Sequence, residues 1–173
     1  MNQRAVVSIV CASQPGLLGA VAQRLFDLGC NLADTTYAAL AGAAELTTIC
    51  ELPPALARET LAFELRRLPE VAGGRVSVSA YHRPDDRGSH RITHRFEVSG
   101  PDRPGLLVRL AETFTAHGAE VLRLNSHTSV TAGDTTHVIR FAVALSDQTA
   151  EDCCAALAAA ATALGLECRT EDA

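Results

Sequence analysis

Apolar and polar residues alternate along several short segments of the chain, and this period of two is typical of β-strands that bury one face. The clearest case runs from Ile139 to Leu145, where apolar residues occupy every second position and Arg140 and small residues lie between them. Similar or plainly extended stretches recur on both sides of it. They predict strands at residues 5–11, 31–40, 46–51 and 75–81 in the first half, and at 95–99, 120–130, 139–145 and 166–170 in the second.

A spacing of three to four residues follows the first strand of each half, and it is typical of one face of a helix. The predicted apolar face is Leu18, Val21, Leu25 and Leu28 in the first half, and Leu107, Leu110 and Phe114 in the second. Gly29 and Gly118 follow these faces. Because glycine readily adopts the left-handed conformation that ends helices, both helices are expected to end there.

A second helix is predicted in each half, after the third strand. Pro53-Pro54 and Ser146-Asp147 are expected to open these helices. Their predicted apolar faces are Leu61, Leu65 and Leu68 in the first half, and Cys154, Leu157, Ala161 and Leu164 in the second.

Both halves therefore have the element order β-α-β-β-α-β. An offset of 89 residues superimposes the Pro-Gly-Leu-Leu segments at 15–18 and 104–107. The expected fold class is α+β, with two ferredoxin-like units in tandem, each an antiparallel sheet with its helices on one face. Right-handed crossovers place the first and third strands in the middle of each sheet. The expected domains are residues 1–82 and 92–173, joined by a polar linker at 83–91.

Composition narrows the function. The chain of 173 residues is 47% hydrophobic, which is enough for packed cores, and its net charge is −5. All 15 basic residues are arginines scattered along the chain, so direct binding of nucleic acid is not expected. No apolar run reaches the length of a membrane span. Six cysteines without a secretory leader or a CxxC pair indicate reduced thiols in a cytoplasmic protein.

The candidate binding residues lie where the first helix of each half begins. Asp102 and Ser13 are expected to cap the helices, with Pro104 and Pro15 in the first turns. Glycine in this turn leaves the helix start bare of side chain, so that backbone N–H groups can meet a ligand closely. The alternative is a capped turn that serves only close packing of helix and sheet.

The segments "DRPGLL" at 102–107 and "GAEVLRLNS" at 118–126 resemble the ACT domain, a small-molecule-binding regulatory module. The segments "SQPGLL" and "LGCNLADT" in the first half are similar to the first domain of tandem-ACT proteins related to the glycine cleavage system transcriptional repressor. The resemblance implies that an amino acid binds between the helix-start loop and the second strand of a neighbouring domain. The candidate ligand-binding residues are Ser13, Gly16, Leu17, Asn31, Asp34, Asp102, Gly105, Leu106 and Asn125.

An amide or carboxylate at Asn31, Asp34 or Asn125 could hold the ammonium group of an amino acid. The alternative is that these three residues are ordinary polar residues of exposed edge strands. The resemblance suggests glycine or serine as the ligand.

The resemblance implies a non-catalytic regulatory protein that senses an amino acid, or regulates transcription through a DNA-binding protein partner, or does both. The alternative is a detached regulatory subunit of an amino-acid metabolic enzyme. A third reading is acyl-phosphate hydrolysis by Arg103 and Asn125, but Gln14 stands in the place of Arg103 in the first half and no nucleophile–base pair is evident. No cofactor is expected, and no metal site, because His90 and His94 lie in a linker running into a strand.

The second strand of each unit is expected to be an exposed edge. Because proteins cover unpaired edges, residues 31–41 are expected to lie near residues 120–130 of the same chain. Pairing between two chains in a homodimer, and back-to-back packing of helices, are the alternatives.

Overall fold

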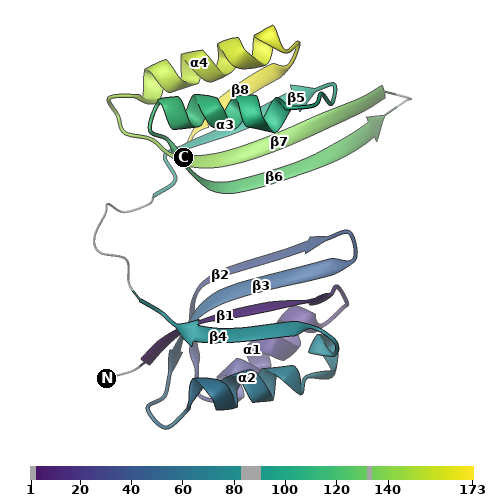
Figure 1. Ribbon diagram of the computed structural model, residues 1–173, viewed down its shortest axis with the longest axis vertical. Helices are drawn as coiled ribbons and strands as arrows, with labels where there is room; N and C mark the ends of the chain where they lie inside the picture. The colour runs from purple at the N-terminus through teal and green to yellow at the C-terminus, as the bar shows by residue number, and fades with distance from the viewer. Residues whose placement is uncertain (1–2, 83–90, 132–133) are drawn as a thin grey trace. The chain divides into compact units, whose positions relative to one another are not determined.

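The computed structural model describes residues 3–82, 91–131 and 134–173. The chain divides into two compact units, Met1–Asp85 and Asp86–Ala173. Figure 1 labels the helices and strands of both units.

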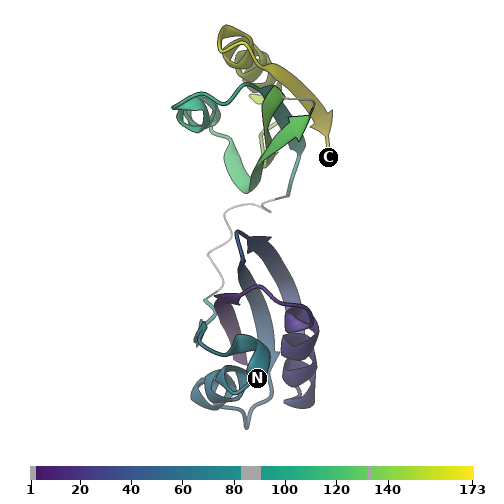
Figure 2. The same cartoon turned by 90° about the vertical axis from the view of Figure 1, so that its right-hand side faces the viewer.

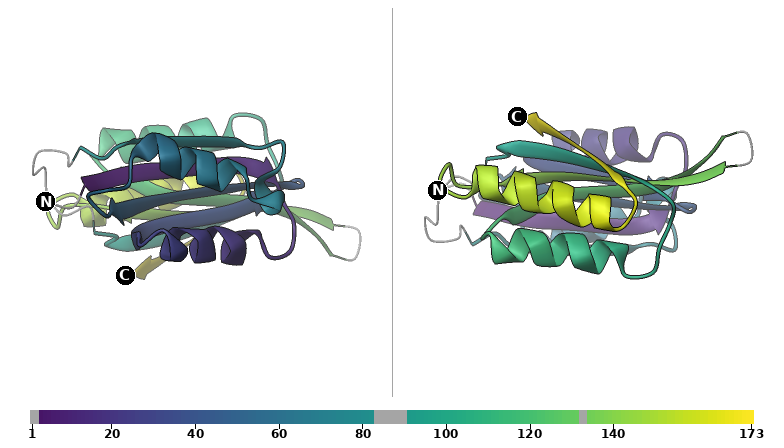
Figure 3. Two further views of the ribbon diagram at one scale, coloured as in Figure 1. Left: turned by 90° about the horizontal axis from the view of Figure 1, so that it is seen from below. Right: turned by 90° about the horizontal axis from the view of Figure 1, so that it is seen from above.

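The first unit has the predicted order of elements. Its sheet contains β1 (Gln3–Ala12), β2 (Asn31–Leu40), β3 (Ala43–Leu52) and β4 (Arg75–Ala80), and its helices are α1 (Leu17–Asp27), α2 (Arg58–Arg66) and the short 3-10 helix η1 (Pro69–Val71). The strand order is β2-β3-β1-β4, so the first and third strands lie in the middle as predicted. Both α-helices cover one face of the sheet (Figures 2 and 3).

The second unit repeats this arrangement. Its strands are β5 (His94–Gly100), β6 (Glu120–Thr131), β7 (Asp134–Ala144) and β8 (Glu167–Asp172), and its helices are α3 (Leu106–Ala116) and α4 (Ala150–Ala163). The strand order is β6-β7-β5-β8. The predicted α+β fold, with two βαββαβ units in tandem, is therefore confirmed.

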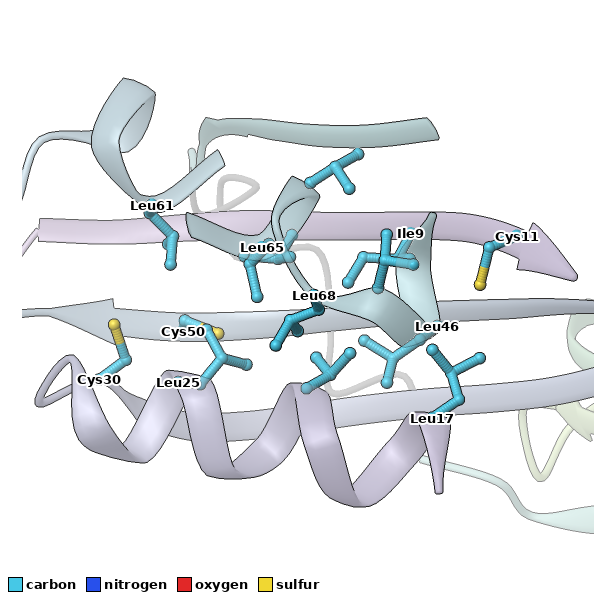
Figure 4. Packing of buried hydrophobic residues seen from close by; sticks show 14 of the residues in the cluster. Ile9, Cys11, Leu17, Leu25, Cys30, Leu46, Cys50, Leu61, Leu65 and Leu68 are labelled. Carbon is cyan, nitrogen blue, oxygen red and sulfur yellow. The ribbon is translucent and has the colours of Figure 1, made fainter. Parts of the chain in front are cut away.

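The first core forms because alternate residues of the central strands point toward the helices. Strand register places Val7 opposite Thr48 and Ile9 opposite Leu46. Leu25 of α1 and the leucines of α2 pack onto this layer (Figure 4). The fully buried hydroxyl of Thr48 is paired with Thr35 Oγ1 of β2, at 2.7 Å, so no polar group is left unsatisfied there.

The second core is built around three phenylalanines. Phe96 and Phe141 face each other across β5 and β7, and Phe114 comes from α3. The Phe114 ring lies 5.4 Å from that of Phe96 and 5.0 Å from that of Phe141, both at tilted angles. Such aromatic pairs contribute about 0.5–1.5 kcal/mol each beyond the burial of their area.

The structure corrects the predicted face of each first helix by one residue. The buried residues of α1 are Leu17, Val21 and Leu25, whereas Leu18 is 45% exposed. In α3 the buried residues are Leu106, Leu110 and Phe114, and Leu107 is 46% exposed. In both helices the residues that face the sheet are therefore four positions apart, whereas the predicted faces began with a spacing of three.

The second helices begin later than predicted. α2 starts at Arg58, because Pro54 disfavours helical backbone at Pro53 and the chain first makes a turn in which Leu56 N–H donates to Pro53 O. α4 starts at Ala150, after a turn at Ser146–Thr149. In α4 the fully buried thiol belongs to Cys153, and Cys154 is half-buried beside the core.

Candidate functional site

The loop between β5 and α3 ends in a left-handed glycine. Gly105 has φ of 81° and is the N-cap of α3, so the helix begins at Leu106. Gly16 does the same for α1, with φ of 87°. Neither helix has a side-chain cap, so the predicted capping by Asp102 and Ser13 is wrong, and Pro104 and Pro15 precede the helices rather than lying in their first turns.

The start of α3 is open to a ligand. A side chain added at Gly105 would meet no atom within 4 Å, which leaves free space over the helix end. The N–H group of Leu106 donates to Arg103 O. The N–H groups of Leu107 and Val108 have no backbone acceptor in the part of the chain that the structure describes. Free N–H groups at the positive end of the helix dipole favour an anion such as a carboxylate.

A pocket of about 220 Å³ lies against this helix start. The loop and the first turn of α3 form one wall, and β6 and β7 form the other. Its lining residues are Asp102, Arg103, Gly105, Leu106, Leu107, Val108, Ser126, His137 and Ile139. The volume is below the range of about 300–1,000 Å³ that is usual for drug-sized ligands, so the pocket suits a smaller molecule.

Two polar residues of this pocket, Ser126 and His137, were not predicted. Ser126 Oγ lies 2.8 Å from His137 Nε2, and Thr128 Oγ1 lies 3.3 Å from His137 Nδ1. Ser126 pairs with the buried Ile139, which places this cluster on the helix-covered side of the sheet. The alternation along β7 could have indicated that His137 faces the helices, because His137 lies two residues before the buried Ile139 and so on the same face of the strand.

The structure separates Asn125 from the other candidates of the second unit. Asn125 pairs with Arg140, whose side chain points away from the helices, so Asn125 lies on the opposite face of the sheet from Asp102 and Gly105. Leu106 is buried, at 5% exposure, so its side chain belongs to the core as well as to the pocket wall.

The corresponding loop of the first unit is tied into its own surroundings. Ser13 N–H donates to Gly42 O, and Gln14 Nε2 donates to Glu70 O. The Leu17 side chain is in the core. The residues that correspond to Ser126, Thr128 and His137 are Tyr37, Ala39 and Ala44, which form no such polar cluster.

Asn31 and Asp34 are both exposed on β2. Asn31 pairs with Glu51, on the sheet face away from the helices. Asp34 lies in the irregular stretch between Leu32 and Thr35, where the register of β2 shifts. Neither residue is beside the loop of its own unit that ends at Gly16.

The thiols of the chain are not poised as nucleophiles. Burial raises the pKa of all six, and that of Cys50 to about 11. Among the described residues, no group of three or more His, Cys, Asp or Glu side chains is arranged to hold a metal ion. None of the described helices has the length and hydrophobicity to cross a membrane.

Comparison with known proteins finds one family match, in the second unit. A family model for the ACT domain matches residues 94–150, which include the β5–α3 loop and the whole pocket. The sequence matches no curated protein.

Two solved structures share the architecture of the whole chain. A protein of unknown function from Galdieria sulphuraria has a TM-score of 0.83 and 19% identity, covering 100% of this chain and 99% of its own. A provisionally named glycine cleavage system transcriptional repressor has a TM-score of 0.66 and 19% identity, covering 100% of this chain and 98% of its own. The chain therefore shares the fold of these two structures over its whole length, and residues 94–150 of its second unit match the ACT-domain family model.

Proposed function

We propose that the chain is a non-catalytic regulatory protein that binds a small amino acid in the pocket at the start of α3. The observation that carries this proposal is a small pocket that combines Asp102, Ser126 and His137 with two N–H groups, of Leu107 and Val108, that have no backbone acceptor among the described residues. ACT domains are regulatory modules that sense amino acids, which agrees with such a site.

The pocket supplies a partner for each group of an amino acid. The N–H groups of Leu107 and Val108 would receive the carboxylate, aided by the helix dipole. The Asp102 carboxylate, on the same wall, would receive the ammonium group. Ser126 and His137 would line the space left for the side chain, and the small volume favours glycine or serine.

The response is proposed to pass to a protein partner, as the repressor-like fold suggests. A net charge of −5 makes direct binding to nucleic acid unfavourable, so a DNA-binding regulator is the expected partner. Six free cysteines agree with a reducing cytoplasm. The second candidate is a regulatory subunit of an amino-acid metabolic enzyme, and a catalytic chain that co-purifies with this one would favour it.

A thermal-shift screen against the common amino acids tests the binding site. A ligand at 100 times its Kd adds about 2.7 kcal/mol to the free energy of unfolding, which raises Tm by several degrees. His137→Ala and Ser126→Ala should reduce the shift. His127→Ala is the matched control, because His127 lies next to Ser126 on β6 but points to the other face.

The proposal fails if no amino acid at millimolar concentration raises the Tm of the wild-type protein. It also fails if His127→Ala reduces the shift as much as His137→Ala. Substitution of Gly105 is a poorer test, because its φ of 81° strains any other side chain and the variant would lose stability for that reason alone.

A further inference from the structure

The helix-free face of the second sheet carries a cluster of arginines. Phe96 and Phe141 point toward the helices, so their neighbours along β5 and β7 point the other way. A pocket of about 450 Å³ lies on this face. Its polar lining residues are Arg95, Glu97, Arg123, Asn125, Arg140, Arg169 and Glu171, which come from all four strands.

The charges in this pocket do not balance. Four arginines and two glutamates line it, in a chain whose net charge is −5. Arg140 Nε is held by Glu97 Oε2 at 2.7 Å. Among the described residues, neither Arg95 nor Arg123 has a carboxylate within ion-pair distance, and Arg169 reaches only the exposed Glu167 at 3.9 Å. The lining of the pocket therefore keeps an excess of positive charge, while Glu120 and Glu167 lie on the same face of the sheet outside this lining.

The fold itself does not require this charge. In the first unit, strand register gives Val6, Ser8, Thr47, Ser77 and Ser79 as the counterparts of Arg95, Glu97, Arg140, Arg169 and Glu171. None of these counterparts is ionisable. The arginines are thus a feature of the second unit alone, although both units have the same sheet.

The chemistry of the cluster selects a phosphate. Guanidinium groups bind phosphate oxygens in pairs, and Arg140 is already oriented by Glu97. Asn125 adds amide donors to the same pocket. Phe96 and Phe141 also line the pocket, but they are only 1% and 2% exposed because their rings are turned toward the core, so they offer a base little surface for stacking.

We propose that this face of the second unit binds a small molecule through a multiply charged phosphate group. The site is separate from the amino-acid pocket, because Arg123 and Asn125 alternate along β6 with Leu124 and Ser126, which face the helices. A phosphorylated effector could therefore bind at the same time as the amino acid.

Calorimetric titration of the full chain with inorganic pyrophosphate at low salt tests the proposal. Loss of one charge-assisted contact in Arg95→Gln or Arg123→Gln should weaken binding about tenfold or more. Arg109→Gln is the matched control, since it removes the same charge from the exposed surface of α3 and should leave the affinity unchanged. A parallel titration with ADP separates inorganic from nucleotide phosphate, and binding of either that depends on Arg123 supports the proposal.

Three results would overturn it: no binding of pyrophosphate or ADP at millimolar concentration, equal weakening in Arg109→Gln, or tighter binding of an acidic peptide than of both phosphates. Far-UV circular dichroism of each variant checks that it is folded. The amino-acid response of Arg123→Gln should equal that of the wild type, so this test and that of the proposed function can fail independently.

Discussion

At the scale of single residues, Gly74 has the least room for a side chain among the described glycines of the first unit. A Cβ placed there would lie 2.6 Å from Cys11 Cβ and 2.9 Å from the carbonyl oxygens of both Val10 and Val71. Two of these three contacts are with backbone, which cannot move aside cheaply. The glycine is needed for the chain to pass from η1 into β4.

Gly74→Ala should lower the free energy of unfolding by about 1–3 kcal/mol, the usual cost of overpacking. Gly19→Ala is its counterpart, because Gly19 lies in α1 with no atom within 4 Å of an added Cβ. That change should raise the free energy of unfolding by about 0.5–1 kcal/mol through better helix propensity. Urea unfolding of both variants measures the difference, and equal effects would contradict this account of Gly74.

At the scale of elements, each first helix meets its sheet through a face fixed by where the helix begins. Leu17 and Leu18 both fit a helical spacing with Val21 and Leu25. The left-handed Gly16 starts α1 at Leu17 and turns that residue, not Leu18, toward the strands. The sequence pattern alone could not choose between two adjacent leucines.

Leu17→Ala should therefore lower the free energy of unfolding by about 2–5 kcal/mol, as expected for a leucine that is 2% exposed. Leu18→Ala should cost less than about 1 kcal/mol, because that side chain is 45% exposed. Chemical denaturation of the two variants, which differ only in which leucine is shortened, compares the faces directly. A larger loss of stability in Leu18→Ala than in Leu17→Ala would contradict this account and favour the helix face predicted from the sequence.

The strands were easier to predict than the site. Alternation over Ile139–Leu145 identified both the strand and its buried side, because a period of two depends only on the chain itself. The Pro-Gly turn likewise located the loop before α3. His137 was missed because it reaches the loop through the pairing of β6 with β7, and that register is set by the folded sheet.

At the scale of the whole molecule, each unit has a second strand at the edge of its sheet. β2 and β6 are bonded to one neighbour each, β3 and β7, in the described parts of the two sheets. Such edges invite pairing with another strand. The pairing of β2 with β6 inside one chain, expected from the sequence, stays a prediction.

Hydrogen exchange can test whether these edges are covered. If β2 and β6 are paired in solution, amides on both sides of each strand should exchange slowly, whereas a free edge protects only those that face the neighbouring strand. Protection that is the same at all protein concentrations supports pairing within the chain. Protection that grows with concentration indicates a homodimer, and fast exchange of alternate amides along both strands contradicts pairing of either kind.

The phenylalanine cluster of the second core also determines how the two units can be observed. The chain has no tryptophan, and its two tyrosines, Tyr37 and Tyr81, both belong to the first unit. Intrinsic tyrosine fluorescence therefore originates entirely in the first unit. The second unit contributes only the sharp near-ultraviolet dichroism bands of Phe96, Phe114 and Phe141. The first unit also has two phenylalanines, Phe26 and Phe63, but both are exposed and should give weaker bands than the packed rings of the second core. Tyrosine fluorescence thus reports on the first unit alone, and occupancy of either site on the second unit is best followed in the phenylalanine bands.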